Sequence, residues 1–231
     1  IVSNHPFENI RYLATTKDEN GYFNIEIKNF HKDLSKKYAI ESEEFQFLQQ
    51  YLSIESAELF FADKAIFIEG ISEGMLLQHF ISEFDNVKLK EEEAAIAANP
   101  DLKTSYIPLS SQNITVVQAG ANAKAFRHFL EFLNIPSVII TDIDTTRPKE
   151  TAKGIRYEAC AVKDVNSCRT SNATITYYLG APEYKQGDAT YSSWYQNMVN
   201  HTANSISTQI YLAYQGEENG YSSRSFDSIM I

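Results

Sequence analysis

The sequence has no long hydrophobic run. Its 231 residues contain short apolar stretches, such as 65–68 and 137–140, far below the roughly 20 residues that cross a bilayer. Only two cysteines are present, Cys160 and Cys168, without a histidine or cysteine at zinc-finger spacing nearby. This scarcity argues against a disulfide scaffold and against structural zinc. We therefore expect a cytoplasmic protein with reduced thiols and no membrane partner.

Several catalytic and nucleotide-binding signatures are also missing. The chain has no P-loop and no glycine-rich dinucleotide fingerprint, so we expect that it does not itself bind ATP. Its five histidines have no placeable serine or aspartate partners, and Cys160 has no identified base, so no hydrolase triad is indicated. The N-terminus has no initiator methionine, basic region or apolar core, which indicates a cut fragment without a signal peptide.

The negative charge is distributed unevenly. The formal net charge is −10, yet residues 41–101 alone carry 14 acidic and three basic residues. Residues 147–169 carry six basic and three acidic residues. The overall charge therefore does not exclude nucleic acid, because phosphate binding depends on where basic side chains gather in space. The alternative interpretation of the basic segment is a solvated face.

Hydrophobic patterning predicts alternating strands and helices in the middle of the chain. Short apolar runs at 64–68, 114–119 and 137–141 indicate buried strands. Apolar residues recurring every three or four positions indicate helices within 41–61, from Ser72 to Phe84, and after Asn122. An insertion with three glutamates at 91–93 and Asn99-Pro100 is expected before the second core strand. Residues 22–27 alternate as a further strand after a turn.

Alternation of strand and helix predicts an α/β fold, with a Rossmann-like parallel sheet flanked by helices. From residue 150 onward the composition shifts to tyrosine, serine, asparagine and threonine. We expect an irregular or helical addition there, closed by a strand at 206–214. Three regions follow: 1–60 as a linker with helices, 61–149 as the core, and 150–231 as a C-terminal extension.

Polar residues follow all three predicted core strands. Glu69 ends the first, the turn at 120–122 ends the second, and Asp142 and Asp144 end the third. Ligand sites in such sheets lie at the carboxyl ends of the strands. Glu73 stands one helical turn after Glu69, and four clustered carboxylates repel one another unless a cation neutralises them. The pattern predicts a site for Mg²⁺ or Mn²⁺, which prefer oxygen ligands.

The motifs at these strand ends resemble the Toprim domain: IFIEG at 66–70, GAN at 120–122 and IITDID at 139–144. With RSFD at 224–227, the chain from about residue 41 to its end resembles the overcoming-lysogenization-defect (OLD) family. Those proteins are ATP-dependent endonucleases of bacterial and phage defence systems. The resemblance implies a Toprim-like core, a truncated nuclease region completed by 150–231, and DNA as the substrate. Residues 1–60 would lead out of an upstream ABC-type ATPase domain.

The resemblance also implies a role for each carboxylate. Glu69 would be a metal ligand or general acid/base, Asp142 and Asp144 metal ligands, and Glu73 a ligand of a second ion. Asp227 stands where the family usually has glutamate, so its ligand role rests on a shorter side chain. The family uses a lysine beyond the last residue of this chain. The fragment alone is therefore expected to bind metal and to cleave DNA poorly or not at all.

The implied reaction is phosphodiester hydrolysis, with two Mg²⁺ or Mn²⁺ ions on either side of the scissile phosphate. Basic side chains beside the strand ends are expected to hold flanking phosphates. The helix N-terminus after Asn122 offers another place for a phosphate. Homo-oligomers are typical of the family's larger assembly. The predicted DNA-binding residues are Lys124, Arg127, Arg147 and Lys149.

Other interpretations of the same residues remain open. The Asp142-x-Asp144-x-Thr146 pattern also fits haloacid-dehalogenase-like phosphatases, with Asp142 as nucleophile and Asp144 as acid/base. In those enzymes the motif generally stands close to the start of the domain. Toprim primases, topoisomerases and ribosomal RNA maturation nucleases share the core carboxylates without the GAN and RSFD motifs. A catalytically inactive Toprim module for assembly or DNA binding would have no need of four costly carboxylates.

Overall fold

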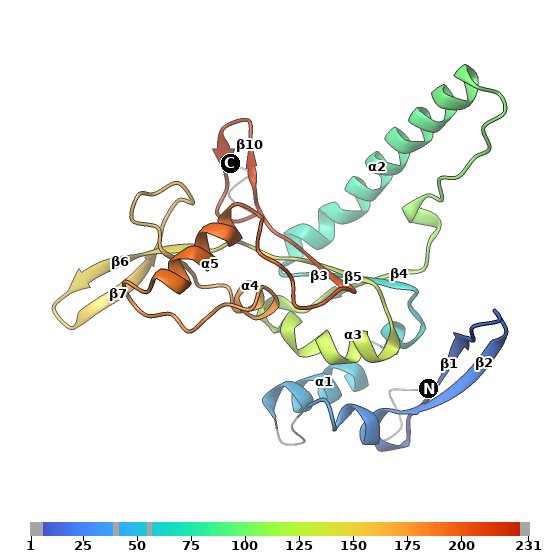
Figure 1. The fold of residues 1–231 in the computed structure, drawn as a ribbon, viewed down its shortest axis with the longest axis horizontal. Helices are drawn as coiled ribbons and strands as arrows, with labels where there is room; N and C mark the ends of the chain where they lie inside the picture. The colour runs from blue at the N-terminus through green and yellow to red at the C-terminus, as the bar shows by residue number, and fades with distance from the viewer. Residues whose placement is uncertain (1–6, 39–41, 55–56, 227–231) are drawn as a thin grey trace.

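The computed structural model describes residues 7–38, 42–54 and 57–226, and a four-stranded sheet lies at its centre. Its strands are β3 (Lys64–Ile68), β4 (Ile114–Gln118), β5 (Ser137–Ile140) and β9 (Ile210–Ala213), in the order β4-β3-β5-β9. All three neighbouring pairs are parallel, and Ala65 pairs with Thr115 on one side and Ser137 on the other. The predicted α/β fold with a parallel sheet flanked by helices is confirmed (Figure 1).

The two faces of the sheet are covered unequally. On one face lie α1 (Glu43–Ile54), η4 (Ala57–Phe61), η6 (Gly120–Phe126) and α3 (Arg127–Leu133). Phe67 and Ile139 point into the main core there and are almost fully buried. Ile68, on the opposite face, forms a small cluster with Leu77 and Ile81 of α2 (Ile71–Ala98), and three partly buried residues pack against it: Ile66, Leu109 and Ile140. Alternation along β3 thus divides its side chains between a large core and a small one.

Helix α2 runs on where an insertion was expected. It continues unbroken through the three glutamates to Ala98, and Figure 1 shows it projecting away from the sheet. No proline or glycine interrupts residues 75–98, and Pro100 stands just beyond the end. The return segment, which includes η5 (Leu109–Ser111), is attached to the helix by Asp85. The buried Asp85 carboxylate accepts hydrogen bonds from Tyr106, Leu109 and Ser110.

The C-terminal region supplies both a helical layer and part of the central sheet. It contains α4 (Ala173–Tyr178) and α5 (Ala189–Val199), and β9 lies within the predicted strand 206–214. The sequence did not predict the hairpin of β6 (Thr145–Thr151) and β7 (Gly154–Ala159), on which β8 (Arg169–Thr170) pairs with β6. Pro148 inside β6 disfavours a strand in any local interpretation. The predicted boundary after residue 149 falls inside β6.

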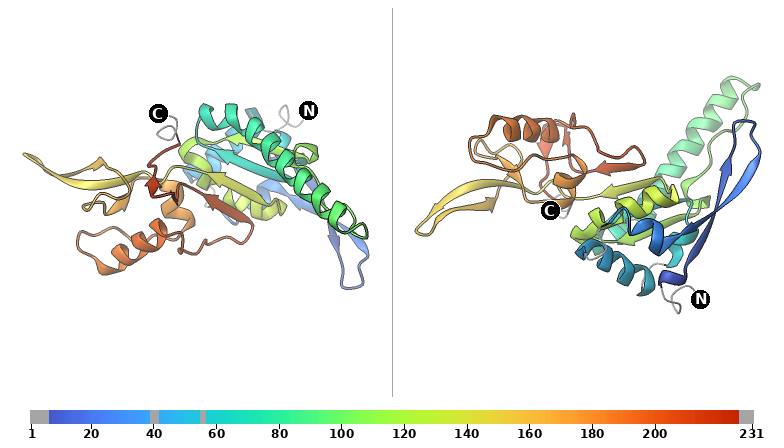
Figure 2. Two further views of the ribbon diagram at one scale, coloured as in Figure 1. Left: turned by 90° about the horizontal axis from the view of Figure 1, so that it is seen from above. Right: turned by 60° about the horizontal axis from the view of Figure 1, so that its bottom comes forward.

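The N-terminal region begins with η2 (Phe7–Asn9), followed by a hairpin of β1 (Arg11–Lys17) and β2 (Phe23–Asn29), which contains the strand predicted at 22–27. Next, η3 (Phe30–Leu34) inserts Phe30 and Leu34 into the main core. A short hairpin of β10 (Glu217–Glu218) and β11 (Tyr221–Ser222) lies near the other end. Figure 2 shows the β1–β2 and β6–β7 hairpins projecting from opposite ends. No helix in the described ranges has the length and apolarity of a membrane span.

Candidate active site at the carboxyl edge of the sheet

Glu69 lies at the carboxyl end of β3, and the chain after β5 holds its side chain. Its Oε1 accepts hydrogen bonds from the Thr141 hydroxyl (2.6 Å) and from Asn172 Nδ2 (3.0 Å). Its Oε2 accepts one from the Asp142 backbone N–H (3.2 Å). These contacts form because β3 and β5 are parallel neighbours that end at the same edge. The structure therefore brings together two of the predicted site residues, Glu69 and Asp142.

The carboxylate of Asp142 is oriented by the C-terminal region. Its Oδ1 accepts hydrogen bonds from Gln215 Nε2 (2.6 Å) and from the Phe226 backbone N–H (2.8 Å). Gln215 in turn accepts a hydrogen bond from the Ile143 backbone N–H (2.8 Å), which fixes the turn after β5. Residues after β9 thus position Asp142, although they are more than 70 positions away in the sequence.

Asn172 is a site residue that the sequence analysis did not identify. Its Nδ2 lies within hydrogen-bond distance of Glu69, of the Thr141 hydroxyl (2.7 Å) and of the Asp142 carbonyl oxygen (2.8 Å). Its Oδ1 accepts hydrogen bonds from the N–H groups that begin α4, so the side chain also caps that helix. Asparagine before a helix is a recognisable cap signal, but nothing local indicates that its amide reaches the site.

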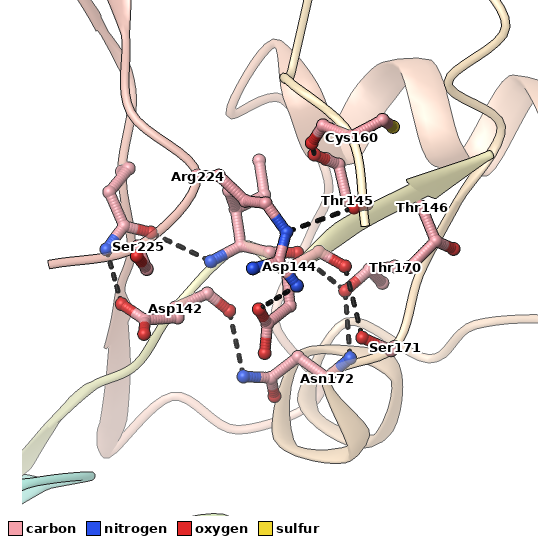
Figure 3. A network of polar contacts seen from close by, with 12 residues as sticks. Asp142, Asp144, Thr145, Thr146, Cys160, Thr170, Ser171, Asn172, Arg224 and Ser225 are labelled. Carbon is pink, nitrogen blue, oxygen red and sulfur yellow. Dashed lines mark hydrogen bonds and ion pairs between the residues drawn. The ribbon is translucent and has the colours of Figure 1, made fainter. Parts of the chain in front are cut away.

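Asp144 is paired with an arginine. Arg224 Nη2 lies 2.6 Å from Asp144 Oδ1, and Arg224 Nε donates to the Thr145 carbonyl oxygen (3.2 Å), as Figure 3 shows. Asp144 has a φ of 48°, in the left-handed region that aspartate tolerates better than most residues. Burial raises the pKa of Asp144, the Arg224 guanidinium lowers it, and the carboxylates of Asp142 and Glu69 raise it further. The net pKa is raised above its ordinary value.

The other two predicted ligands are placed differently. Glu73 is buried, and its Oε2 accepts a hydrogen bond from the Gly70 backbone N–H (3.0 Å) at the start of α2. A Cβ at Gly70 would lie only 2.8 Å from that oxygen, so any other residue there would make the Glu73 carboxylate shift. The structure therefore gives Glu73 a role at the helix N-terminus. Asp227 lies outside the described residues.

The described carboxylates at this edge are suitable ligands for a hard divalent cation, but their arrangement in this structure is not that of a metal site. Carboxylate oxygens are suitable ligands for Mg²⁺ and Mn²⁺. The negative charges of Glu69 and Asp142 raise the pKa of Asp144, so the three carboxylates interact electrostatically. Within the described ranges, however, no three histidine, cysteine, aspartate or glutamate side chains are gathered closely enough to hold one ion. The charge of Asp144 is instead neutralised by Arg224. A cation shared by these carboxylates requires that this ion pair open.

A cavity of about 530 Å³ adjoins Glu69. It lies between α1 and the ends of β3 and β4, and Tyr51 forms part of its wall and donates a hydrogen bond to the Gln118 carbonyl oxygen (3.2 Å). Gly120 in the same wall has a φ of 54°, which glycine adopts without strain. Glu69 is therefore reachable from a hollow large enough for part of a substrate.

The predicted DNA-binding cations are all engaged in ion pairs. Lys124 pairs with Glu44 (3.4 Å) and Arg127 with Glu131 (3.0 Å). On the β6–β7 hairpin, Arg147 and Lys149 both pair with Glu158, at 3.0 and 2.6 Å. Arg147 also pairs with Asp164 (2.6 Å). These cations therefore lie in mixed-charge surroundings, and DNA binding by them remains a prediction.

Comparison with known proteins gives two matches. A family model described as overcoming lysogenization defect protein-like, TOPRIM domain, matches residues 60–99 and 96–144. The whole chain aligns with Endonuclease GajA of Bacillus cereus (strain HuB5-5), with 28% identity over 236 residues. The chain spans 28% of the length of that relative. No solved structure matches the chain. The TOPRIM match includes Glu69, Asp142 and Asp144, and it favours the Toprim interpretation of this motif over the phosphatase one.

Proposed function

We propose that this chain is the nuclease region of a divalent-metal-dependent DNA endonuclease, because residues 60–99 and 96–144 match the model of the overcoming-lysogenization-defect-like TOPRIM domain. The observation that carries the proposal is the joint placement of Glu69 and Asp142 by the Asn172 amide at the carboxyl edge of the sheet. The similarity of the whole chain to a protein named an endonuclease supports it.

In the proposed reaction, water cleaves a phosphodiester bond of DNA beside Glu69. We assign Glu69 the role of metal ligand or general acid/base, and Asp142 and Asp144 the role of ligands. TOPRIM domains generally depend on divalent metals, and a bound ion, Mg²⁺ or Mn²⁺, supplies positive charge that offsets the carboxylates and the phosphate. The Thr141 hydroxyl and the Asn172 amide both donate hydrogen bonds to Glu69 Oε1, and the Asn172 amide also contacts the Thr141 hydroxyl. These contacts hold the Glu69 carboxylate in position.

The proposal extends to the rest of the assembly. Two ions are proposed, with Glu73 and Asp227 as the further ligands, although Glu73 now contacts the backbone of Gly70. An ABC-type ATPase domain upstream in the same polypeptide, a homo-oligomeric assembly, a cytoplasmic location and a role in phage defence or DNA processing belong to the same proposal. In this proposal, residues 1–60 connect the ATPase domain to the nuclease region, residues 61–149 form the Toprim core, and residues 150–231 complete the nuclease region.

The test is cleavage of a supercoiled plasmid by the complete protein. We expect nicking or linearisation with Mg²⁺ or Mn²⁺ and none with EDTA. Loss of a general acid/base typically costs roughly 100-fold or more, so Glu69→Gln should be at least that much slower. Asp142→Asn should be impaired as well.

Glu183→Gln is the matched control, because the Glu183 side chain is 82% exposed and forms a surface ion pair with Lys185. It should cleave like the wild type. Full activity in both Glu69→Gln and Asp142→Asn would place the chemistry elsewhere. Covalent phosphate on Asp142, trapped with a fluoride analogue, would instead support the phosphatase interpretation.

A further inference from the structure

Arg169 on β8 packs against two neighbouring aromatic rings. Its guanidinium carbon lies 4.6 Å from the centroid of the Tyr157 ring and 4.9 Å from that of Tyr184. The Tyr157 hydroxyl donates a hydrogen bond to the Tyr184 hydroxyl (2.9 Å), and the two rings meet at 87°. Two cation–π contacts restrict the positions that the guanidinium can take. Arg169 is therefore a preorganised cation.

The charge of Arg169 is not balanced by a carboxylate within the described part of the chain. Its Nε is buried and has no hydrogen-bond partner there, and no described aspartate or glutamate forms an ion pair with it. Lys124, Arg127, Arg147 and Lys149, in contrast, are each paired with a carboxylate. An anionic ligand beside this uncompensated guanidinium would be favoured.

The surroundings of Arg169 have the chemistry of a phosphate site. Arg169 lines a cavity of about 350 Å³ together with Lys124, and threonine and tyrosine residues form much of the remaining wall. The described lining contains no aspartate or glutamate. Lys124 pairs with Glu44 at 3.4 Å, and such a partly exposed pair exchanges at little cost.

The chain from Arg169 runs directly into the proposed active site. Thr170 donates a hydrogen bond to the Ile143 carbonyl oxygen (2.6 Å), and the Ser171 N–H donates to the Asp144 carbonyl oxygen (3.0 Å). Asn172 then contacts Glu69. Figure 3 shows residues 170–172 beside Asp142 and Asp144. Three residues of chain span at most about 11 Å, so the Arg169 backbone lies within that distance of Asn172.

We propose that Arg169, together with Lys124, binds a backbone phosphate of the DNA strand beside the scissile bond. The inference rests on the proposed nuclease function and adds to it a substrate-binding residue and the position of a neighbouring phosphate. Free nucleotides carry the same phosphate chemistry, so the test separates the two sources.

The test is the salt dependence of DNA binding by the complete protein, measured by fluorescence anisotropy of a labelled duplex in EDTA. Loss of one phosphate contact lowers the slope of log K against log salt concentration by about one. We expect that change in Arg169→Gln. Arg156→Gln is the control, because Arg156 is exposed on β7 and the substitution removes the same charge. Arg169→Lys should keep the slope and lose part of the affinity.

Thermal unfolding shows whether each variant is folded, and Lys124→Gln, in the same cavity, repeats the test if Arg169→Gln does not fold. An unchanged slope in folded Arg169→Gln, or in Lys124→Gln where that variant replaces it, overturns the inference while leaving the proposed nuclease function intact. No DNA binding by the wild type overturns both. A parallel titration with dAMP identifies the source of the phosphate. Binding of dAMP that depends on Arg169, with an unchanged DNA slope, assigns the cavity to a free nucleotide and overturns the DNA assignment.

Discussion

Arg224 controls the charge balance of the site at the scale of single residues. It is the cation in contact with Asp144, whose carboxylate is close enough to those of Glu69 and Asp142 for their charges to raise its pKa. The guanidinium therefore supplies positive charge that a bound metal ion would otherwise supply. A divalent ion has to compete with it for Asp144.

Replacing Arg224 should strengthen metal binding. An ion pair whose side chains are about 30% exposed is worth about 1 kcal/mol, so Arg224→Gln should raise the affinity for Mn²⁺ about fivefold. Isothermal titration calorimetry measures this directly. Arg156→Gln removes an equal charge from the exposed face of β7 and should leave the affinity unchanged. Weaker Mn²⁺ binding in Arg224→Gln would mean that Arg224 supports the site instead of competing with the ion.

Asn172 joins the site to the helical layer. One side chain caps α4 and contacts Glu69, Thr141 and Asp142. Its amide donors position the carboxylate of Glu69, while its oxygen stabilises the helix. The two roles can be separated, because serine is also a good helix cap but has no amide.

Asn172→Ser should therefore reduce cleavage more than it reduces stability. Loss of a buried hydrogen bond to a charged group costs about 2 kcal/mol, which corresponds to a roughly 30-fold lower kcat, with little change in KM. Steady-state kinetics and thermal unfolding give the two quantities. Asp188→Ser likewise replaces a helix cap by serine, at α5, and should leave kcat unchanged. Equal losses of activity in both variants would refute a positioning role for Asn172.

At the scale of elements, the buried carboxylate of Asp85 attaches the return segment to α2. Burial opposes ionisation of Asp85, but hydrogen bonds from Tyr106, Ser110 and Leu109 outweigh it and hold the pKa of Asp85 well below its ordinary value of 3.8. The contribution of this carboxylate to stability is present above that ordinary value. It is lost as the pH falls toward the lower pKa of the folded state.

Asp85→Asn should loosen the return segment without disturbing the sheet. We expect faster amide hydrogen exchange at residues 102–111 and unchanged exchange in β3 and β5 at neutral pH, measured by mass spectrometry. In the wild type the same segment should lose protection only in strong acid. Asp101→Asn, at the exposed tip, is the control. Unchanged exchange in Asp85→Asn would show that other contacts hold the segment.

The core strands were predictable because local patterns define them. The apolar runs at 64–68 and 114–119 are short, and each is followed by polar or glycine residues that end a strand. The outer half of α2 has no apolar face to reveal it, only the absence of a helix breaker. The strand β6 was missed because Pro148 disfavours a strand locally. Pairing with β7 and β8 nevertheless stabilises it.

The candidate site was predictable only in part. Placing Glu69 and Asp142 at neighbouring strand ends follows from parallel topology, which the alternation of elements already indicates. The partners of these residues do not follow, since Gln215 lies 73 positions from Asp142 and Asn172 lies 103 positions from Glu69. Such contacts come from the packing of the C-terminal region. They carry no local signature that a single sequence reveals.

On the scale of the whole molecule, three elements extend beyond the central sheet. Helix α2 and the hairpins β1–β2 and β6–β7 project in different directions (Figures 1 and 2). One face of the β1–β2 hairpin exposes Leu13, Phe23, Ile25 and Ile27, each more than 60% accessible. The candidate site is instead assembled from residues 69 to 226, so the C-terminal region contributes to it directly.

The most direct test of the account is Mn²⁺ titration of the complete protein by calorimetry, comparing the wild type with Glu69→Gln and Asp142→Asn. Glu183→Gln serves as the control. We predict Mn²⁺ binding by the wild type and the control, and loss of at least one site in each of the two variants. Binding that is unaffected by both substitutions, or no binding by the wild type, would contradict a metal-dependent site at these strand ends. The inactive Toprim module for assembly or DNA binding would then be the better interpretation.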